Sequence, residues 1–137
     1  MRISSRCEYA CRAMLELAQR GATEETVTSQ VIAVRREIPE KYLVHILLQL
    51  KRAGLVQSVR GAQGGYRLVE SPDRVSVLDI IEAIDGPVED QLPGREGTSP
   101  EFKPVWRSVS RAIREQLKAT SLQRILDASS ADEMYYI

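Results

Sequence analysis

Apolar residues recur at intervals of three and four along most of this 137-residue chain, which predicts a mainly helical fold. The period predicts a helix over residues 5–19 and a short helix over residues 29–34, which Thr28 can cap. A third helix is expected to open at Pro39, where a missing amide costs nothing, and to stop at Gly54, which can supply a left-handed turn. Short helices joined by a tight turn are typical of a helix-turn-helix.

The third helix divides into two faces of different character. The face expected to be buried consists of Tyr42, Leu43, Ile46, Leu47 and Leu50. The remaining positions are mostly polar, and they are left free to meet a partner. They are Glu40, Lys41, Val44, His45, Leu48 and Lys51.

After the third helix the spacing of apolar residues changes to two. Residues 55–59 and 66–69 alternate well enough to predict a β-hairpin. Its tip, residues 61–65, carries three glycines, which permit a tight turn and a close approach of the backbone to a ligand. Arg60 stands beside the tip. A plain surface hairpin is the alternative, but a helix followed by a basic hairpin is how a winged helix-turn-helix reads nucleic acid.

The second half of the chain predicts three further helices. Residues 76–79 read as a helix start, and Gly86 ends that helix. Residues 88–103 predict an acidic loop, a longer helix follows over residues 104–119, and a short helix comes last. A lone amphipathic helix needs a partner to cover its apolar side. On the longer helix that side holds Val105, Trp106, Val109, Ala112, Ile113 and Leu117.

The net charge of zero argues at first against a nucleic-acid partner, but the charges are unevenly distributed. Residues 35–74 hold eight Lys or Arg against four Asp or Glu, a local charge of +4. Residues 75–103 hold two against seven, a local charge of −5. This layout lets one face approach phosphate while another faces away.

The first residues of the chain indicate where the protein is located in the cell and what state its two cysteines are in. The first ten residues lack an apolar core of signal-peptide length, and no run approaches about 18 apolar residues, so we expect a cytoplasmic protein with no membrane partner. Cys7 and Cys11 then need not be bridged. They share one helix face and fit small core residues, with a redox or ligand role as the alternative. Ser5 and Glu8 fit a capping box.

Three stretches of the chain carry a resemblance to one protein family: MRISSRCEYACRAMLELA, IPEKYLVHILLQLKRAGLVQSVRGAQGGYRL and VSVLDIIEAIDGP. Over nearly its whole length the chain resembles the Rrf2 family of bacterial transcription regulators. The resemblance implies a mainly α fold with a small β-hairpin wing, namely a winged helix-turn-helix joined to a long dimerisation helix. Residues 1–72 would form the DNA-binding domain, and residues 73–137 the linker helix, acidic loop, dimerisation helix and final short helix.

The resemblance also implies roles for residues that match the family's motifs. The third helix would enter the major groove of double-stranded DNA, Arg60 would reach a narrowed minor groove, and Thr28, Ser29 and Tyr42 would hold phosphates. The expected DNA-binding residues are Thr28, Ser29, Glu40, Lys41, Tyr42, His45, Arg52, Arg60, Gly61 and Gln63. Two protomers would pair through the long helix as a homodimer on a pseudo-palindromic site. The expected dimerisation residues are Val105, Trp106, Val109, Ile113 and Leu117.

Two departures from the family's pattern limit what the resemblance implies. Some members carry a glutamate at the position of Val44, and valine offers only apolar contact where glutamate can discriminate at cytosine. Many members hold an iron–sulfur cluster with three cysteines in the loop after Gly86-Pro87, where this chain has none. His45 is the only histidine. We therefore expect no metal site and no other cofactor, and we expect Glu8 to act in its capping box.

Three classes of function compete on this evidence. The first is a cluster-free homodimeric regulator, most often a repressor in this family, whose signal is a small molecule, a thiol change or a partner protein. The second is a protein-interaction module with weak DNA binding, regulated through a partner protein. The acidic loop and the apolar C-terminal tail, residues 134–137, favour it. The third is an enzyme, and the sequence gives no support for it. There is no nucleophile motif with histidine, and the glycines of residues 61–65 are not a phosphate-binding loop, because no helix follows them.

Overall fold

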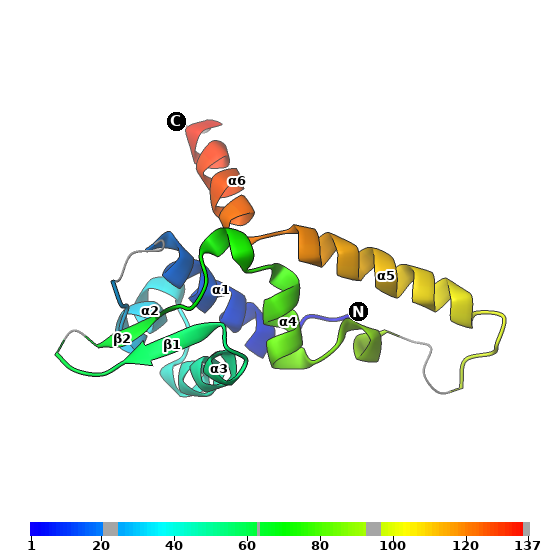
Figure 1. Ribbon diagram of the computed structural model, residues 1–137, viewed down its shortest axis with the longest axis horizontal. Helices are drawn as coiled ribbons and strands as arrows, with labels where there is room; N and C mark the ends of the chain where they lie inside the picture. The colour runs from blue at the N-terminus through cyan, green and yellow to red at the C-terminus, as the bar shows by residue number, and fades with distance from the viewer. Residues whose placement is uncertain (21–24, 63, 93–96, 136–137) are drawn as a thin grey trace.

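The computed structural model describes residues 1–20, 25–62, 64–92 and 97–135, with no account of the side chains of residues 132–135. It confirms a mainly helical fold with a two-stranded antiparallel hairpin (Figure 1). In chain order the elements are α1 (Ser5–Gln19), α2 (Ser29–Arg36), α3 (Glu40–Arg52), β1 (Val56–Val59), β2 (Gly65–Leu68), the 3-10 helix η1 (Pro72–Arg74), α4 (Val77–Asp85), the 3-10 helix η2 (Val88–Gln91), α5 (Lys103–Ala119) and α6 (Leu122–Tyr135).

Helix α1 is the element on which the others pack. It contacts α2, α3, α4, α6 and strand β2, and in Figure 1 it lies among them in the body of the molecule. The same core extends past residue 72, because Val75, Ile80 and Leu122 belong to it. The largest side chains that α1 and α3 bury in this core are Met14, Leu17, Leu43, Ile46, Leu47 and Leu50.

The start of α1 differs from the expected capping box. Ser4, not Ser5, caps the helix: its Oγ accepts a hydrogen bond from the Cys7 amide at 3.0 Å. The same hydroxyl donates to Oδ1 of Asp85 at 2.6 Å. Because Asp85 lies 81 residues away at the end of α4, local sequence could not reveal this contact. Glu8 is therefore free of the cap and faces outward.

The cap of α4 and the helix-turn-helix follow the prediction closely. Ser76 and Asp79 form a capping box, with the Asp79 amide 3.1 Å from Ser76 Oγ and the Ser76 amide 2.9 Å from Asp79 Oδ2. Thr28 caps α2, which runs two residues beyond the expected end. Glu37 makes the turn with a left-handed φ of 54°, and Gly54 ends the third helix at φ 79°.

The hairpin is pinned to the chain segment before α2. Val27 and Tyr66 exchange backbone hydrogen bonds of 2.9 and 2.8 Å, which places the start of β2, next to the hairpin tip, beside the start of α2. Gly65 makes this approach possible, since a Cβ there would lie 2.6 Å from the Val27 carbonyl oxygen. Its φ of 149° also disfavours any larger residue. The wing is thus held at a fixed position relative to α2.

The last two helices leave the body from one anchored junction. The Val77 amide donates to the Thr120 carbonyl and the Leu122 amide to the Val75 carbonyl, both at 2.9 Å. From there α5 and α6 diverge (Figure 1). Helix α6 was expected to be short, but it has 14 residues. In the part of the chain that the structure describes, every helix is too short or too polar to cross a membrane.

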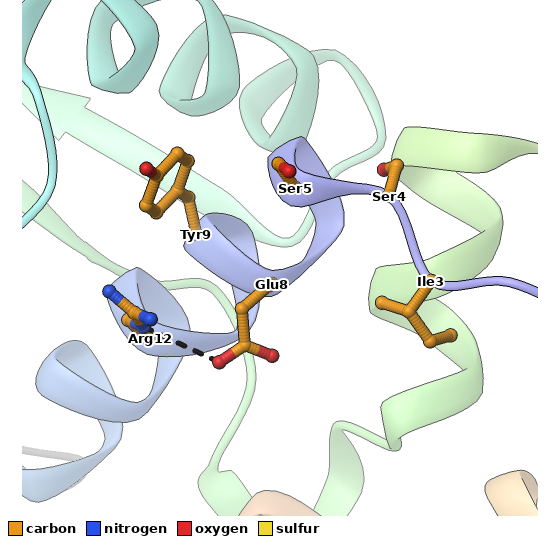
Figure 2. Close-up of a pocket in the computed structure, with 6 residues that line it drawn as sticks. All are labelled: Ile3, Ser4, Ser5, Glu8, Tyr9 and Arg12. Atoms are coloured by element: carbon orange, nitrogen blue, oxygen red, sulfur yellow. Dashed lines mark hydrogen bonds and ion pairs between the residues drawn. The ribbon is translucent and has the colours of Figure 1, made fainter.

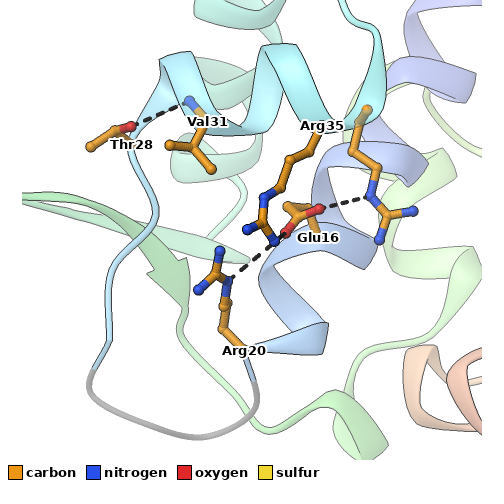
Figure 3. Close-up of polar contacts among 6 residues, drawn as sticks. Glu16, Arg20, Thr28, Val31 and Arg35 are labelled. Carbon is orange, nitrogen blue, oxygen red and sulfur yellow. Dashed lines mark hydrogen bonds and ion pairs between the residues drawn. The ribbon is translucent and has the colours of Figure 1, made fainter.

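Glu16 is a buried carboxylate surrounded by arginines. Its side chain is 3% exposed, and its Oε1 accepts a hydrogen bond from Arg36 Nε at 3.0 Å. Nη1 of Arg35 lies 3.5 Å, and Nε of Arg20 lies 3.9 Å, from Oε2 (Figure 3). Burial of a carboxylate is costly unless cations compensate its charge. Because two of these arginines belong to α2, the cluster fastens α2 to α1.

We expect Glu16→Gln to lower the free energy of unfolding by about 1.5–3 kcal/mol, because hydrogen bonds to a charged group are lost and the arginines are left uncompensated. Urea unfolding followed by circular dichroism measures the loss. Glu8→Gln is the matched control: Glu8 also pairs with an arginine four residues on in α1, but its side chain is 57% exposed. The control should change stability by at most about 0.5 kcal/mol. Equal losses in both variants would contradict the role given to burial.

Candidate nucleic-acid interface

Three surfaces come together at one end of the molecule. They are the exposed face of α3, the start of α2 and the hairpin of β1 and β2, which lie next to one another in Figure 1. The Val27–Tyr66 bridge joins the second and third of these, and α3 packs against β1. Most of the residues expected to bind DNA lie on these three surfaces.

The exposed face of α3 carries the predicted groove-reading residues. Glu40, Lys41, Tyr42 and His45 are all exposed. Spacings of four, three and four residues give Lys41, His45, Leu48 and Arg52 a common stripe on this helix. Val44 and Leu48 add apolar surface, at 59% and 43% exposed. This face therefore offers cations, hydrogen-bonding groups and apolar contacts together.

Tyr42 was expected on the buried face of α3, and that expectation is wrong, since the residue is 43% exposed. One residue before Leu43 on the helix, it sits at the edge of the buried face and packs sideways instead. Its ring stacks on Tyr9 of α1, with centroids 6.1 Å apart and planes inclined by 22°. Lys41 Nζ lies 5.2 Å from the Tyr42 ring centroid. The exposed position suits the phosphate contact expected of Tyr42.

Tyr9 and Arg12 extend this surface, and local sequence indicated neither of them. Arg12 Cζ lies 5.4 Å from the Tyr9 ring centroid, so a row of cation, ring, ring and cation runs from Arg12 to Lys41. Helical spacing placed Tyr9 only in the apolar stripe of α1. A stack between residues 33 positions apart leaves no mark in local sequence.

The start of α2 and the wing place the remaining predicted contacts. Thr28 is exposed and its Oγ1 accepts the Val31 amide at 3.3 Å, which leaves its hydroxyl hydrogen to donate (Figure 3). Ser29 is half-buried. Arg60 and Gly61 are exposed at the tip of the hairpin. Gln63 lies outside the described residues.

The predicted pairing residues of α5 fall into two groups. Ile113 and Leu117, near the end of the helix, pack against the cluster of Cys7, Leu78, Ile81 and Val88 in their own chain. Toward the start of α5, Val105 is 48% and Val109 37% exposed, and Trp106 is half-buried. Phe102, just before the helix, is 56% exposed and extends this apolar surface. Helix α5 buries no residue fully.

The two cysteines lie between α1 and α4. Cys7 is fully buried, and Cys11, one turn later, is half-buried. The hydrogen bond from the Cys7 thiol to Cys11, together with burial, raises the pKa of Cys7 above that of an ordinary thiol. Accepting that bond lowers the pKa of Cys11, in spite of its own burial. The two thiols therefore differ in both access and acidity.

Comparison with known proteins gives a consistent result. The family model Rrf2, described as an iron-dependent transcriptional regulator, matches residues 3–128. The HTH-type transcriptional regulator CymR of Bacillus subtilis (strain 168) is 32% identical over 140 residues, 100% of both chains. The HTH-type transcriptional regulator IscR of Aliivibrio salmonicida (strain LFI1238) is 36% identical over 131 residues, which cover 92% of this chain and 77% of that protein. The structure of CymR (YrzC), the global cysteine regulator of B. subtilis, superposes with a TM-score of 0.82 at 32% identity, covering 93% of this chain and 98% of that one.

That description raises the question whether this chain has the ligands for an iron centre. The whole sequence holds two cysteines and one histidine. Both cysteines lie on α1, where the Cys7 thiol is buried and held protonated, whereas His45 is exposed on α3. Among the residues that the structure describes, no three His, Cys, Asp or Glu side chains are grouped to hold a metal ion. An iron–sulfur cluster held by several thiolates does not fit this donor set.

Iodoacetamide should label Cys11 well before Cys7 in the folded protein, because the thiolate is the reactive form and Cys7 is both buried and kept protonated. The lowered pKa of Cys11 predicts that its labelling begins at a lower pH than that of an ordinary cysteine. Peptide mass spectrometry before and after unfolding in guanidinium measures the order, with equal labelling of both residues expected only after unfolding. Early labelling of Cys7 would contradict this account.

Proposed function

This chain belongs to the Rrf2 family of transcriptional regulators, and on that premise we propose that it binds double-stranded DNA sequence-specifically to regulate transcription. The single observation that carries the proposal is the joint placement of an exposed α3 face and an arginine-tipped wing. The Val27–Tyr66 bridge and the packing of α3 on β1 hold these surfaces in one arrangement. A rigid arrangement is required if a helix and a wing are to meet successive grooves together.

Helix α3 enters the major groove in this proposal. Lys41, His45 and Arg52 approach base edges and phosphates, while Val44 and Leu48 offer apolar contact to thymine methyl groups. The hydroxyls of Thr28 and Tyr42 bind phosphates of the DNA backbone and set the position of the protein along the duplex. The preferred bases will therefore differ from those of relatives that carry a glutamate in place of Val44.

The wing supplies a second reading element. Arg60 is exposed at the end of β1, beside the glycine-containing tip. A guanidinium at the end of a narrow hairpin suits a minor groove narrowed by A·T-rich sequence, where the negative potential is concentrated. Gly61 carries no side chain, so the protein backbone beside Arg60 can also approach the minor groove closely.

The protein acts as a homodimer in this proposal. The exposed apolar surface at the start of α5, formed by Phe102, Val105, Trp106 and Val109, supports pairing with a second copy, because a helix with one apolar side needs cover. Residues 1–72 then read DNA and residues 73–137 bring two copies together. Two-fold symmetry requires a pseudo-palindromic operator. A dimer seated on an operator blocks access to it, so repression is the proposed outcome.

No iron–sulfur cluster takes part in the proposed function. The support is the donor set, since the two cysteines lie on α1 and the loop after α4 offers no thiolate. The regulatory signal is then a small molecule, a thiol change or a partner protein.

The second candidate is a module that docks another protein and binds DNA only weakly. The exposed apolar surface of α5 is the observation that favours it, because a partner of a different kind could cover the same side chains. Selection of bound genomic fragments by the purified protein at about 150 mM salt, where contacts to phosphate alone are weakened, separates the two. Enrichment of one inverted repeat supports the regulator. Sequence-blind, weak binding favours the docking module.

Arg60→Ala should weaken binding to the selected site by about 1–3 kcal/mol, as loss of one base-reading contact does. Fluorescence anisotropy with labelled duplex measures the change. Arg107→Ala removes the same charge from an exposed position on α5 and should leave affinity nearly unchanged. Unchanged affinity in Arg60→Ala would remove the wing arginine from the reading mechanism.

Trp106→Glu should disrupt the dimer, because it places a charge on the apolar surface of the pairing helix. Analytical ultracentrifugation over a range of protein concentrations measures the shift toward monomer. Arg107→Gln is the control, since it alters net charge by the same amount at the next residue but on the polar side. A Trp106→Glu variant that sediments like the wild type would show that the pairing surface lies elsewhere.

A further inference from the structure

An open cavity of about 350 Å³ lies at the start of α1 and shares Tyr9 and Arg12 with the edge of the candidate nucleic-acid interface. The chain before the helix supplies one side of it and the outward face of α1 the other (Figure 2). Its size suits a small molecule. The residues that line it are Ile3, Ser4, Ser5, Glu8, Tyr9 and Arg12.

Opposite charges stand side by side in this cavity. Glu8 Oε1 and Arg12 Nε are 3.4 Å apart, longer than a good charge-assisted hydrogen bond, and their side chains are 57% and 40% exposed. Such a pair contributes little to stability, so a ligand can open it at small cost. A ligand that carries both charges could satisfy both groups, with its ammonium on Glu8 and its carboxylate on Arg12. Ile3 and the Tyr9 ring offer apolar contact to the rest of such a molecule.

The same cavity is coupled to the DNA-reading helix through its own lining residues. Arg12 lies over the Tyr9 ring at 5.4 Å, and Tyr9 stacks on Tyr42 at 6.1 Å. Lys41 completes the row at 5.2 Å from the Tyr42 ring. Tyr42 and Lys41 stand in the first turn of α3. A change in the position or charge of Arg12 therefore reaches the residues proposed to meet DNA.

We propose that this cavity binds a small zwitterion of the α-amino-acid class and that the Arg12–Tyr9–Tyr42–Lys41 row transmits its presence to α3. The ligand's carboxylate draws Arg12 away from the Tyr9 ring, which loosens the stack that holds Tyr42 and Lys41. DNA affinity then falls by about two- to fivefold, the range of an exposed cation–π contact. By linkage, DNA lowers the affinity for the amino acid by the same factor. This inference supplies a signal for the proposed regulator and rests on that function.

The first experiment is calorimetric titration of the full-length protein, without DNA, with each of the twenty common L-amino acids. The best binder is then compared with its carboxamide, which lacks the carboxylate, and with its N-acetyl derivative, which lacks the ammonium. We expect both derivatives to bind about tenfold more weakly or not at all, because each loses one charged hydrogen bond. Absence of binding by all twenty amino acids, or equal binding of the derivatives, would overturn the proposal.

Variants then locate the site. Glu8→Gln and Arg12→Gln should each weaken binding by about tenfold or more. Glu70→Gln and Arg74→Gln are the matched controls, since this pair is also an exposed glutamate and arginine four residues apart but lies outside the cavity. The controls should bind as the wild type does. Loss of binding in the controls, or retention in the cavity variants, would place the ligand elsewhere and overturn the proposal.

The coupling is tested with the selected operator in the presence and absence of the best-binding amino acid. The wild type should show the two- to fivefold loss of DNA affinity, and Tyr9→Phe, which keeps the ring, should show it too. The Tyr9→Leu variant should still bind the amino acid, but the amino acid should no longer change the DNA affinity of this variant. An identical loss in Tyr9→Leu, or none in the wild type, would overturn the proposed route. Failure of the unliganded protein to bind DNA would instead count against the proposed function, because ligand binding is measured without DNA.

Discussion

Every surface proposed to meet DNA is positioned by the burial of α1. This helix must be covered on several sides, and α2, α3, α4, α6 and β2 supply the cover. Apolar contacts with α1 fix the position of α3, whereas the Glu16 carboxylate fixes the position of α2 through arginines at the end of α2. Apolar packing tolerates some sliding, but a buried carboxylate requires its cations close by. The two kinds of contact together define one arrangement of the helix-turn-helix.

The wing depends on a second constraint, which is the absence of a side chain at Gly65. Only a glycine allows Val27 and Tyr66 to exchange their backbone hydrogen bonds at this distance. That exchange ties the hairpin to the start of α2 and so fixes the position of the wing relative to the cap residue Thr28. A hairpin joined to the body only through its own strands would leave the angle between wing and α3 undefined.

The fold also separates two kinds of exposed apolar surface. On α3, Val44 and Leu48 stand among polar and charged neighbours, as a groove-reading face requires. On α5, Val105 and Val109 follow Phe102 along a helix that projects from the body (Figure 1). The first surface suits base edges, and the second suits another apolar surface such as a second copy. Ile113 and Leu117 pack the C-terminal end of α5 against the body of the same chain, whereas the apolar side chains at its N-terminal end remain exposed.

Local sequence determined the features whose physics is local. Pro39, Gly54 and the Ser76–Asp79 box mark helix ends through interactions within a few residues, and alternation marked the hairpin. Tertiary structure alone decided what depends on partners far along the chain. Ser4 rather than Ser5 caps α1, with its hydroxyl held by Asp85, and Tyr42 stacks on Tyr9 of α1 instead of entering the core. Hydrogen bonds and stacking between distant residues have no period in the sequence, so the groups that assemble the candidate site become visible only once the chain is folded.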